Sequence, residues 1–282
     1  ADTDPDEMRG TAWLTRRFAF TTLPSVDSLA VVRAAGQDAA GRERRAFRGF
    51  GAPLIGMGAG DPLSASAPAE EFFRGALADV ATVRALPALP QTGPELRRLA
   101  ATLGAPQDSL SLGAAATERA VKETDLSNTA VLAFATHGLL SGELPGLAEP
   151  ALVLTPPDIA TQEDDGLLTA SEVAALRLSA DWVILSACNT AGGDGRPDAE
   201  GLSGLARAFL YAGARAILVS HWPVRDDAAA RLTADAMAAL GDGTGRSEAL
   251  RRAMLTLMED ETDLSLAHPA SWAPFVVVGE GA

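Results

Sequence analysis

The stretch DWVILSACNTAGG, residues 181–193, decides the fold, because an apolar run ends there in a cysteine followed by glycines. The run WVILSA is typical of a strand that is covered on both faces of a sheet. Cys188 is the only cysteine of the chain. Its thiol is either a small apolar side chain of the core or a nucleophile presented at the end of a strand.

Similar apolar runs recur along the chain and alternate with helical patterns. The predicted strands are TAVLAFA (129–135), ALVL (151–154), WVILSA (182–187), ARAILVS (214–220), APFVVVG (273–279) and APLIGMG (52–58). The predicted helices are GPELRRLAATL (93–103), SEVAAL (171–176), LSGLARAFLYAG (202–213), DDAAARLTADAMAAL (226–240) and SEALRRAMLTLME (247–259). This alternation predicts an α/β fold in which helices cover both faces of a mostly parallel sheet of about six strands.

Length and composition predict a globular protein. The chain has 282 residues, of which 47% are hydrophobic, enough for a sizeable core. No apolar stretch reaches the roughly 18 residues that span a bilayer, and the start ADTDPDEMRG lacks the basic and apolar parts of a signal peptide. We therefore expect a cytoplasmic protein that binds no membrane.

The net charge and the numbers of cysteine and histidine residues disfavour several classes of function. A formal net charge of −14 disfavours direct binding of nucleic acid. The basic segment GRERRAFR, residues 41–48, is interpreted as a solvated loop or helix face, with a polyanion site or a protease-sensitive loop as alternatives. One cysteine and three scattered histidines predict no metal site, and no phosphate-binding glycine motif is present. We expect no cofactor.

Two reactive side chains follow predicted strands. FATHGLL places His137 just after one strand, and ILSACNTAGG places Cys188 just after another. If these strands are parallel neighbours, both side chains emerge at the same edge of the sheet, where sites form in such folds. The glycines that follow, Gly138 and then Gly192 and Gly193, leave room for a substrate.

This pair suits acyl transfer. A thiolate is a strong nucleophile, and a nearby imidazole can activate it or protonate a leaving amine near neutral pH. The developing oxyanion needs donors, and the backbone N–H groups of Gly138 and Cys188 are expected to supply them.

The chain also resembles a known family. VLAFATHGLL, DGLLTASEVAALRLSADWVILSACNTAGG, GLSGLARAFLYAGARAILVSHWPV and HPASWAPFVVVG look, in that order, like a CHAT domain, one of the caspase-like cysteine peptidases. His137 lies 51 residues before Cys188, close to the spacing in caspases. SACNT replaces the caspase signature around the cysteine, which fits CHAT or separase-like members and removes grounds for assuming specificity for aspartate. The resemblance implies a caspase-like three-layer sandwich.

The resemblance further implies a cysteine endopeptidase with a His137 and Cys188 dyad. HWPVRDDAAA, residues 221–230, resembles the separase segment whose aspartate binds an arginine side chain, and that position is Asp226. Asp226, helped by Asp194, would then favour Arg or Lys before the cleaved bond. The competing interpretation is that Asp226 only stabilises a helix start. His221 follows a strand and is a further candidate for substrate contact.

We expect residues 1–282 to form a single domain, with an N-terminal subdomain at 1–127 and a catalytic core at 128–282. The resemblance implies a protein or peptide substrate and a regulatory partner or helical-repeat module, with a role in bacterial defence or cell death. A catalytically silent scaffold that binds proteins through the same groove is the alternative. A nucleotide-binding domain is disfavoured, because the chain lacks a phosphate-cradling motif.

Overall fold

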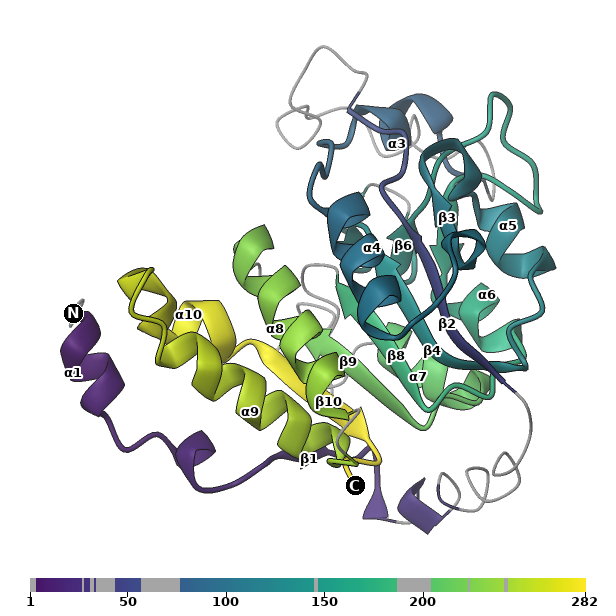
Figure 1. Cartoon of the computed structure of the whole chain (residues 1–282). Helices are drawn as coiled ribbons and strands as arrows, with labels where there is room; N and C mark the ends of the chain where they lie inside the picture. The colour runs from purple at the N-terminus through teal and green to yellow at the C-terminus, as the bar shows by residue number, and fades with distance from the viewer. Residues whose placement is uncertain are drawn as a thin grey trace.

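The computed structural model describes residues 4–26, 28–30, 33, 44–56, 77–144, 147–186, 204–222, 224–240 and 243–282 (Figure 1). Its centre is a seven-stranded sheet with the strand order β1-β10-β9-β8-β4-β2-β3. The strands are β1 (Thr21–Thr22), β2 (Arg45–Gly51), β3 (Leu110–Leu112), β4 (Thr129–Ala135), β8 (Trp182–Ser186), β9 (Ala216–Ser220) and β10 (Phe275–Gly279). Neighbouring strands are parallel except for β9 and β10. The predicted α/β class and mostly parallel sheet are confirmed.

Helices cover both faces of this sheet. The α-helices are α1 (Pro5–Gly10), α3 (Val80–Ala85), α4 (Thr92–Thr102), α5 (Glu118–Glu123), α6 (Ala170–Ala175), α7 (Gly204–Ala212), α8 (Asp226–Leu240), α9 (Arg246–Met258) and α10 (Pro269–Trp272). Short 3₁₀ helices occur at Leu14–Arg16, Gln107–Ser109, Gly113–Ala115 and Leu264–Ala267. Helices α4, α8 and α9 contribute to the core on one face, and α5, α6 and α7 to the core on the other. Figure 1 shows α8 and α9 side by side along their face.

Strand β8 explains why an unbroken apolar run forms the middle of the sheet. Trp182 and Ile184 enter the core under α4, α8 and α9, whereas Val183 and Leu185 enter the core under α5, α6 and α7. All four side chains are buried. Burial of each side chain contributes about 1.5–3 kcal/mol. Because helices cover both faces of the strand, the residues that point to either face must be apolar.

Strand β2 corrects the sequence prediction for residues 41–58. Residues 52–56 are not a strand, residues 57 and 58 lie outside the described part, and β2 instead runs through the segment interpreted as a solvated loop or helix face. Phe47 and Phe50 are buried in opposite cores, which fixes β2 between β3 and β4. Arg48 is tolerated there because its guanidinium donates to the Asp108 carbonyl and the Ser111 hydroxyl.

A second correction concerns the predicted strand at 151–154. This segment forms β6 (Ala151–Val153) in a separate three-stranded sheet with β5 (Gly138–Leu139) and β7 (Leu167–Thr169). Both pairings are antiparallel. Leu152 and Ala151 pair with Gly138 and Leu139, the two residues after His137, so this strand belongs to the small sheet and not to the centre of the main sheet.

Candidate active site

Strands β4 and β8 bring the two predicted reactive segments together. They are parallel neighbours, and Ala135 at the end of β4 is the register partner of Ser186 at the end of β8. His137 follows Ala135 by two residues, and in the sequence Cys188 follows Ser186 by two residues. Cys188 itself lies outside the described residues. The shared register means that both segments leave the sheet at the same edge and at the same height.

A pocket opens at this edge. It is lined by Leu89, Gln91, Thr92, Glu95, Thr136, His137, Ser186, Ser220, Val224, Ala229 and Phe275. These residues come from the ends of β4, β8 and β9, the start of β10, the first turns of α4 and α8, and the segments just before these two helices. The pocket has a volume of about 50 Å³, and both apolar and polar side chains line it.

The imidazole of His137 is held by the loop before α4. Its Nε2 atom lies 2.8 Å from the carbonyl oxygen of Pro87. A carbonyl oxygen only accepts hydrogen bonds, so Nε2 carries the proton in the neutral ring and Nδ1 carries the lone pair. The contact therefore selects the tautomer in which Nδ1 can take up a proton.

Gly138, the expected oxyanion donor, begins β5. The N–H of Val153 donates to the carbonyl oxygen of His137, and Gly138 faces Leu152 across the antiparallel pair. Hydrogen-bonded and non-hydrogen-bonded pairs alternate along such a ladder. The N–H of Gly138 therefore points away from β6 and is not used in the pairing of these two strands.

Glu95 is a buried carboxylate in the pocket that the sequence analysis did not single out. It lies in the first turn of α4 with 5% of its surface exposed. The Ser186 hydroxyl donates to its Oε2 at 2.9 Å, and the Thr233 hydroxyl donates to its Oε1 at 3.2 Å. Glu95 thus joins α4, the end of β8 and α8 beneath the site.

The three residues predicted to bind substrate differ in where they lie relative to the pocket of His137. Asp226 is the first residue of α8 and lies in the chain between Val224 and Ala229, which both line the pocket. Asp194 lies outside the described residues. His221 follows β9 at the same edge but does not line the pocket of His137.

His221 instead lines a second, wider pocket of about 460 Å³ between the N-terminal segment and α9. Trp13, Phe20 and Trp272 contribute to its walls, and Phe275 lines both pockets. Partial burial lowers the pKa of His221.

Three tryptophans differ in exposure. Trp182 and Trp272 are buried, whereas Trp222 is 40% exposed. Trp222 follows the end of β9, where the chain leaves the sheet, and its indole N–H donates to the carbonyl oxygen of Ala270. His268 caps α10 by accepting from the N–H of Ala270.

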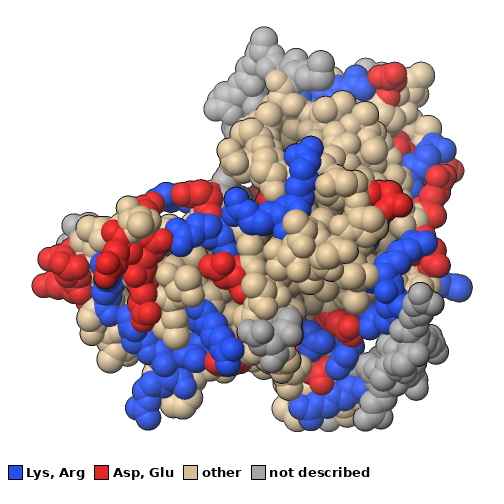
Figure 2. Space-filling view, viewed as in Figure 1, with Lys and Arg blue, Asp and Glu red and all other residues tan. Residues whose placement is uncertain are grey.

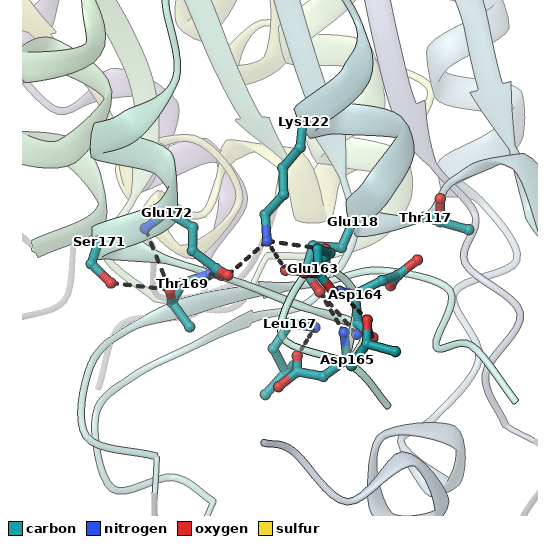
Figure 3. Close-up of polar contacts among 12 residues, drawn as sticks. Thr117, Glu118, Lys122, Glu163, Asp164, Asp165, Leu167, Thr169, Ser171 and Glu172 are labelled. Carbon is teal, nitrogen blue, oxygen red and sulfur yellow. Dashed lines mark hydrogen bonds and ion pairs between the residues drawn. The ribbon is translucent and has the colours of Figure 1, made fainter. Parts of the chain in front are cut away.

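A second polar cluster supports the small sheet that carries Gly138 (Figure 3). Lys122 donates to the carboxylates of Glu118 and Glu172, which come from α5 and α6. Glu118 also accepts from the backbone N–H groups of Asp165 and Gly166, at 2.7 and 3.2 Å, just before β7. Burial raises the pKa of Glu118 to about 8. The cluster fixes the loop that leads into β7.

Pro87, Glu95 and Ser186 are the site residues that sequence reasoning missed. Ser186 stands two residues before Cys188, so its place at the rim could be read from the strand pattern. Pro87 acts through its backbone, which leaves no signal in residue type. Glu95 occupies the first turn of a helix, where an acidic residue is ordinary.

The described part of the chain lacks two further features. Within the described ranges, no three His, Cys, Asp or Glu side chains are grouped to hold a metal ion. In the same part of the chain, no helix combines the length and the hydropathy needed to cross a membrane. Figure 2 shows basic and acidic side chains interspersed over the viewed face.

Curated relatives match part of the chain. Tetratricopeptide repeat protein 28 of Mus musculus is 38% identical over 113 residues, and the Homo sapiens protein of that name is 34% identical over 113 residues. Each match covers 40% of this chain and 4% of the relative, so the chain spans a small part of their length.

Two solved structures are also similar. The Arg specific cysteine proteinase gingipain R has a TM-score of 0.48 and 12% identity, covering 88% of this chain and 51% of that one. Separase in the Saccharomyces cerevisiae separase–securin complex has a TM-score of 0.48 and 14% identity, covering 98% of this chain and 14% of that one. The family model described as CHAT domain matches residues 2–280. Since that match extends over nearly the whole length, the chain belongs to the CHAT domain family.

Proposed function

We propose that this CHAT domain is a cysteine endopeptidase that uses His137 and Cys188 as its catalytic dyad. The observation that carries the proposal is the register of β4 and β8, in which Ala135 faces Ser186. Two residues beyond these partners stand an imidazole and a thiol, the two groups that thiol acyl transfer requires. The resemblance of the surrounding blocks to caspase-like peptidases supports the same assignment.

The proposed reaction uses the tautomer selected by Pro87. Nδ1 of His137 takes the proton of the Cys188 thiol, and the thiolate attacks the carbonyl carbon of the scissile peptide bond. The N–H groups of Gly138 and Cys188 stabilise the oxyanion. As the C–N bond breaks, the leaving amine takes the proton from Nδ1, which leaves an acyl-enzyme thioester.

Water completes the cycle. Nδ1 accepts a proton from the attacking water, the hydroxide adds to the thioester carbonyl, and the C–S bond breaks. The departing thiolate takes the proton back from Nδ1. The products are a new carboxyl terminus and a new amino terminus, and the dyad returns to its starting state.

Cleavage after a basic residue and control by a partner are parts of this proposal. The net charge of −14 attracts cationic peptides, and Asp226 and Asp194 are acidic candidates near the site in sequence. Tetratricopeptide repeat protein 28 carries repeats in its name, which supports a helical-repeat module as the regulatory partner.

The test is digestion of a peptide library, read by mass spectrometry, with the wild type, Cys188→Ala and His137→Ala. Cleavage by the wild type alone is expected, because either substitution removes one half of the dyad. His268→Ala is the matched control, since that histidine caps α10 and should leave cleavage intact. Absence of cleavage by the wild type, with candidate activators added, would favour the silent scaffold.

A further inference from the structure

We propose that the N-terminal segment, residues 13–20, and helix α9 form a docking surface for a partner protein, which inserts an apolar side chain and places carboxylates beside it. Among the described residues, Phe275 is the only one that the pocket of this surface shares with the pocket of His137. The proposed binding does not depend on the peptidase function and can be tested without it.

The centre of the docking surface is the pocket that His221 lines. Its volume of about 460 Å³ falls within the range of ligand-binding pockets, about 300–1,000 Å³. Most of its walls are apolar, and Trp13, Phe20, Trp272 and Phe275 are aromatic. The rings of Trp13 and Trp272 lie edge to face with their centres 5.6 Å apart. Such walls suit an aromatic ring or a leucine side chain as the inserted group.

Apolar side chains beside the pocket are exposed. Leu14, Phe18 and Phe20 are 66%, 48% and 51% exposed. Leu14 and Phe20 also line the pocket, and the ring of Phe18 lies 6.4 Å from the ring of Phe20. Figure 1 shows the segment that carries them passing along α9. Single exposed apolar residues are ordinary, but a group of them at a pocket is typical of an interaction site.

The charge of the docking surface is opposite to that of the whole chain. Residues 13–20 include Arg16 and Arg17 and no acidic residue, whereas the chain has a net charge of −14. Arg17 is exposed beside the Phe18 ring, and among the described residues it has no carboxylate partner. No described residue that lines the pocket is acidic. The surface therefore favours a partner with carboxylates next to its apolar side chain.

The segment is held in place before any partner binds. Nη1 of Arg251 donates to the carbonyl oxygens of Thr15 and Arg16, at 3.4 and 3.2 Å, while Nε and Nη2 of the same side chain donate to the Glu248 carboxylate. Further along, β1 pairs with β10. A surface that is already ordered loses little conformational entropy on binding, which favours affinity.

The first step of the test is selection of random dodecapeptides displayed on phage. The immobilised protein is Cys188→Ala, which lacks the thiol of the proposed dyad, so cleavage cannot hide binding. We expect the enriched peptides to contain an aromatic residue or leucine flanked by Asp or Glu. Enrichment of basic peptides, or of no peptide, would overturn the inference. The outcome does not depend on whether the chain is a peptidase.

The second step measures the Kd of the enriched peptides by fluorescence anisotropy, with each substitution added to Cys188→Ala. Leu14→Glu and Arg17→Glu should each weaken binding at least about tenfold, because the first removes an apolar contact and the second reverses a charge that faces the peptide. Arg17→Lys should keep most of the affinity. Rising salt should weaken binding to the unsubstituted surface more than binding to Arg17→Glu.

Ile159→Glu is the matched control for Leu14→Glu. Ile159 is 79% exposed in the loop between β6 and β7 and should not affect the peptides. Since Leu14, Arg17 and Ile159 are all exposed, the urea midpoints of these variants should match that of the parent chain. The inference is wrong if Leu14→Glu weakens none of the enriched peptides, or if Ile159→Glu weakens them equally.

Two other occupants of the docking surface predict different results. A second copy of the chain would give a dimer in light scattering that Leu14→Glu dissociates. An anionic membrane would give sedimentation with vesicles of phosphatidylcholine and phosphatidylglycerol that Arg17→Glu abolishes. Either result, without an acidic peptide whose affinity depends on Leu14, would refute the assignment to an acidic protein partner.

Discussion

The Nε2 atom of His137 lies 2.8 Å from the carbonyl oxygen of Pro87, so a backbone group of the loop before α4 orients the proposed catalytic imidazole. His137 follows β4, whereas Pro87 stands 50 residues earlier in the sequence. The tautomer of the histidine therefore depends on how the loop before α4 docks against the edge of the sheet.

Replacing Pro87 with glycine should lower kcat about tenfold and leave KM nearly unchanged. Proline locks its own φ angle, and glycine releases it, so the carbonyl oxygen would lose its fixed direction. Misorientation of a catalytic group costs rate rather than substrate affinity. Steady-state kinetics on the best peptide measures both constants. Pro90→Gly, in the same loop, is the control, and an equal loss in both variants would contradict the prediction.

Stability should fall as pH rises through the range in which Glu118 ionises. Burial raises the pKa of Glu118 to about 8, against 4.5 for an unperturbed glutamate. The folded state therefore binds more protons than the unfolded state between these values. The contribution of Glu118 to stability is complete below about pH 4.5 and is lost as the pH rises through 8. The free energy of unfolding then falls by up to about 1.4 kcal/mol per pH unit.

Urea unfolding at pH 5, 7 and 9 measures this effect, with Glu118→Gln as the comparison. The neutral amide cannot ionise, so the wild type should lose stability relative to Glu118→Gln as pH rises. Glu123→Gln, on the exposed side of the same helix, should follow the wild type. Parallel pH profiles of wild type and Glu118→Gln would show that Glu118 is ionised throughout.

Strands whose two faces are both covered could be predicted from sequence. Strands β4 and β8 are unbroken apolar runs, and β4 begins and ends where the sequence indicated. Strand β2 could not be found in this way, because Arg45 and Arg48 interrupt its apolar pattern. Their guanidinium groups donate to the carbonyl oxygens of Asp125 and Asp108, which only the folded chain brings near.

Some residues of the candidate site could likewise be predicted from the sequence, and others could not. The place of His137 at the pocket was predictable, because this residue follows strand β4 by two positions. The burial of Glu95 was not, because an acidic residue in the first turn of an amphipathic helix is typical of a solvated position. Its burial arises only when α8 and the end of β8 pack against α4.

Alanine at Gly213 should destabilise the fold by about 2–4 kcal/mol, at the upper end for a single substitution. Gly213 joins α7 to β9 with φ of +115°, and a Cβ there would lie 2.3 Å from the carbonyl oxygen of Leu178. Gly104→Ala is the matched control, because its φ is +62° and a Cβ would meet nothing within 4 Å. Its expected cost is about 1 kcal/mol. Similar urea midpoints for the two variants would contradict the steric argument.

Asp181→Asn should lower the free energy of unfolding by about 2 kcal/mol and leave peptide cleavage unchanged. Asp181 stands just before β8, at the opposite end of the strand from Ser186, and accepts from Arg44 at 2.7 Å and from Arg215 at 2.9 Å. The amide cannot compensate two cations, and both arginine side chains are largely covered, at 13% and 22% exposure.

Asp158→Asn supplies the comparison for this pair of contacts. Its carboxylate is 98% exposed where it pairs with Arg84, so water and salt screen the attraction and the expected cost is below about 0.5 kcal/mol. Chemical denaturation of both variants at two salt concentrations measures the difference. If Asp181→Asn is no less stable than Asp158→Asn, the contacts of Asp181 with its two arginines contribute nothing to the free energy of unfolding.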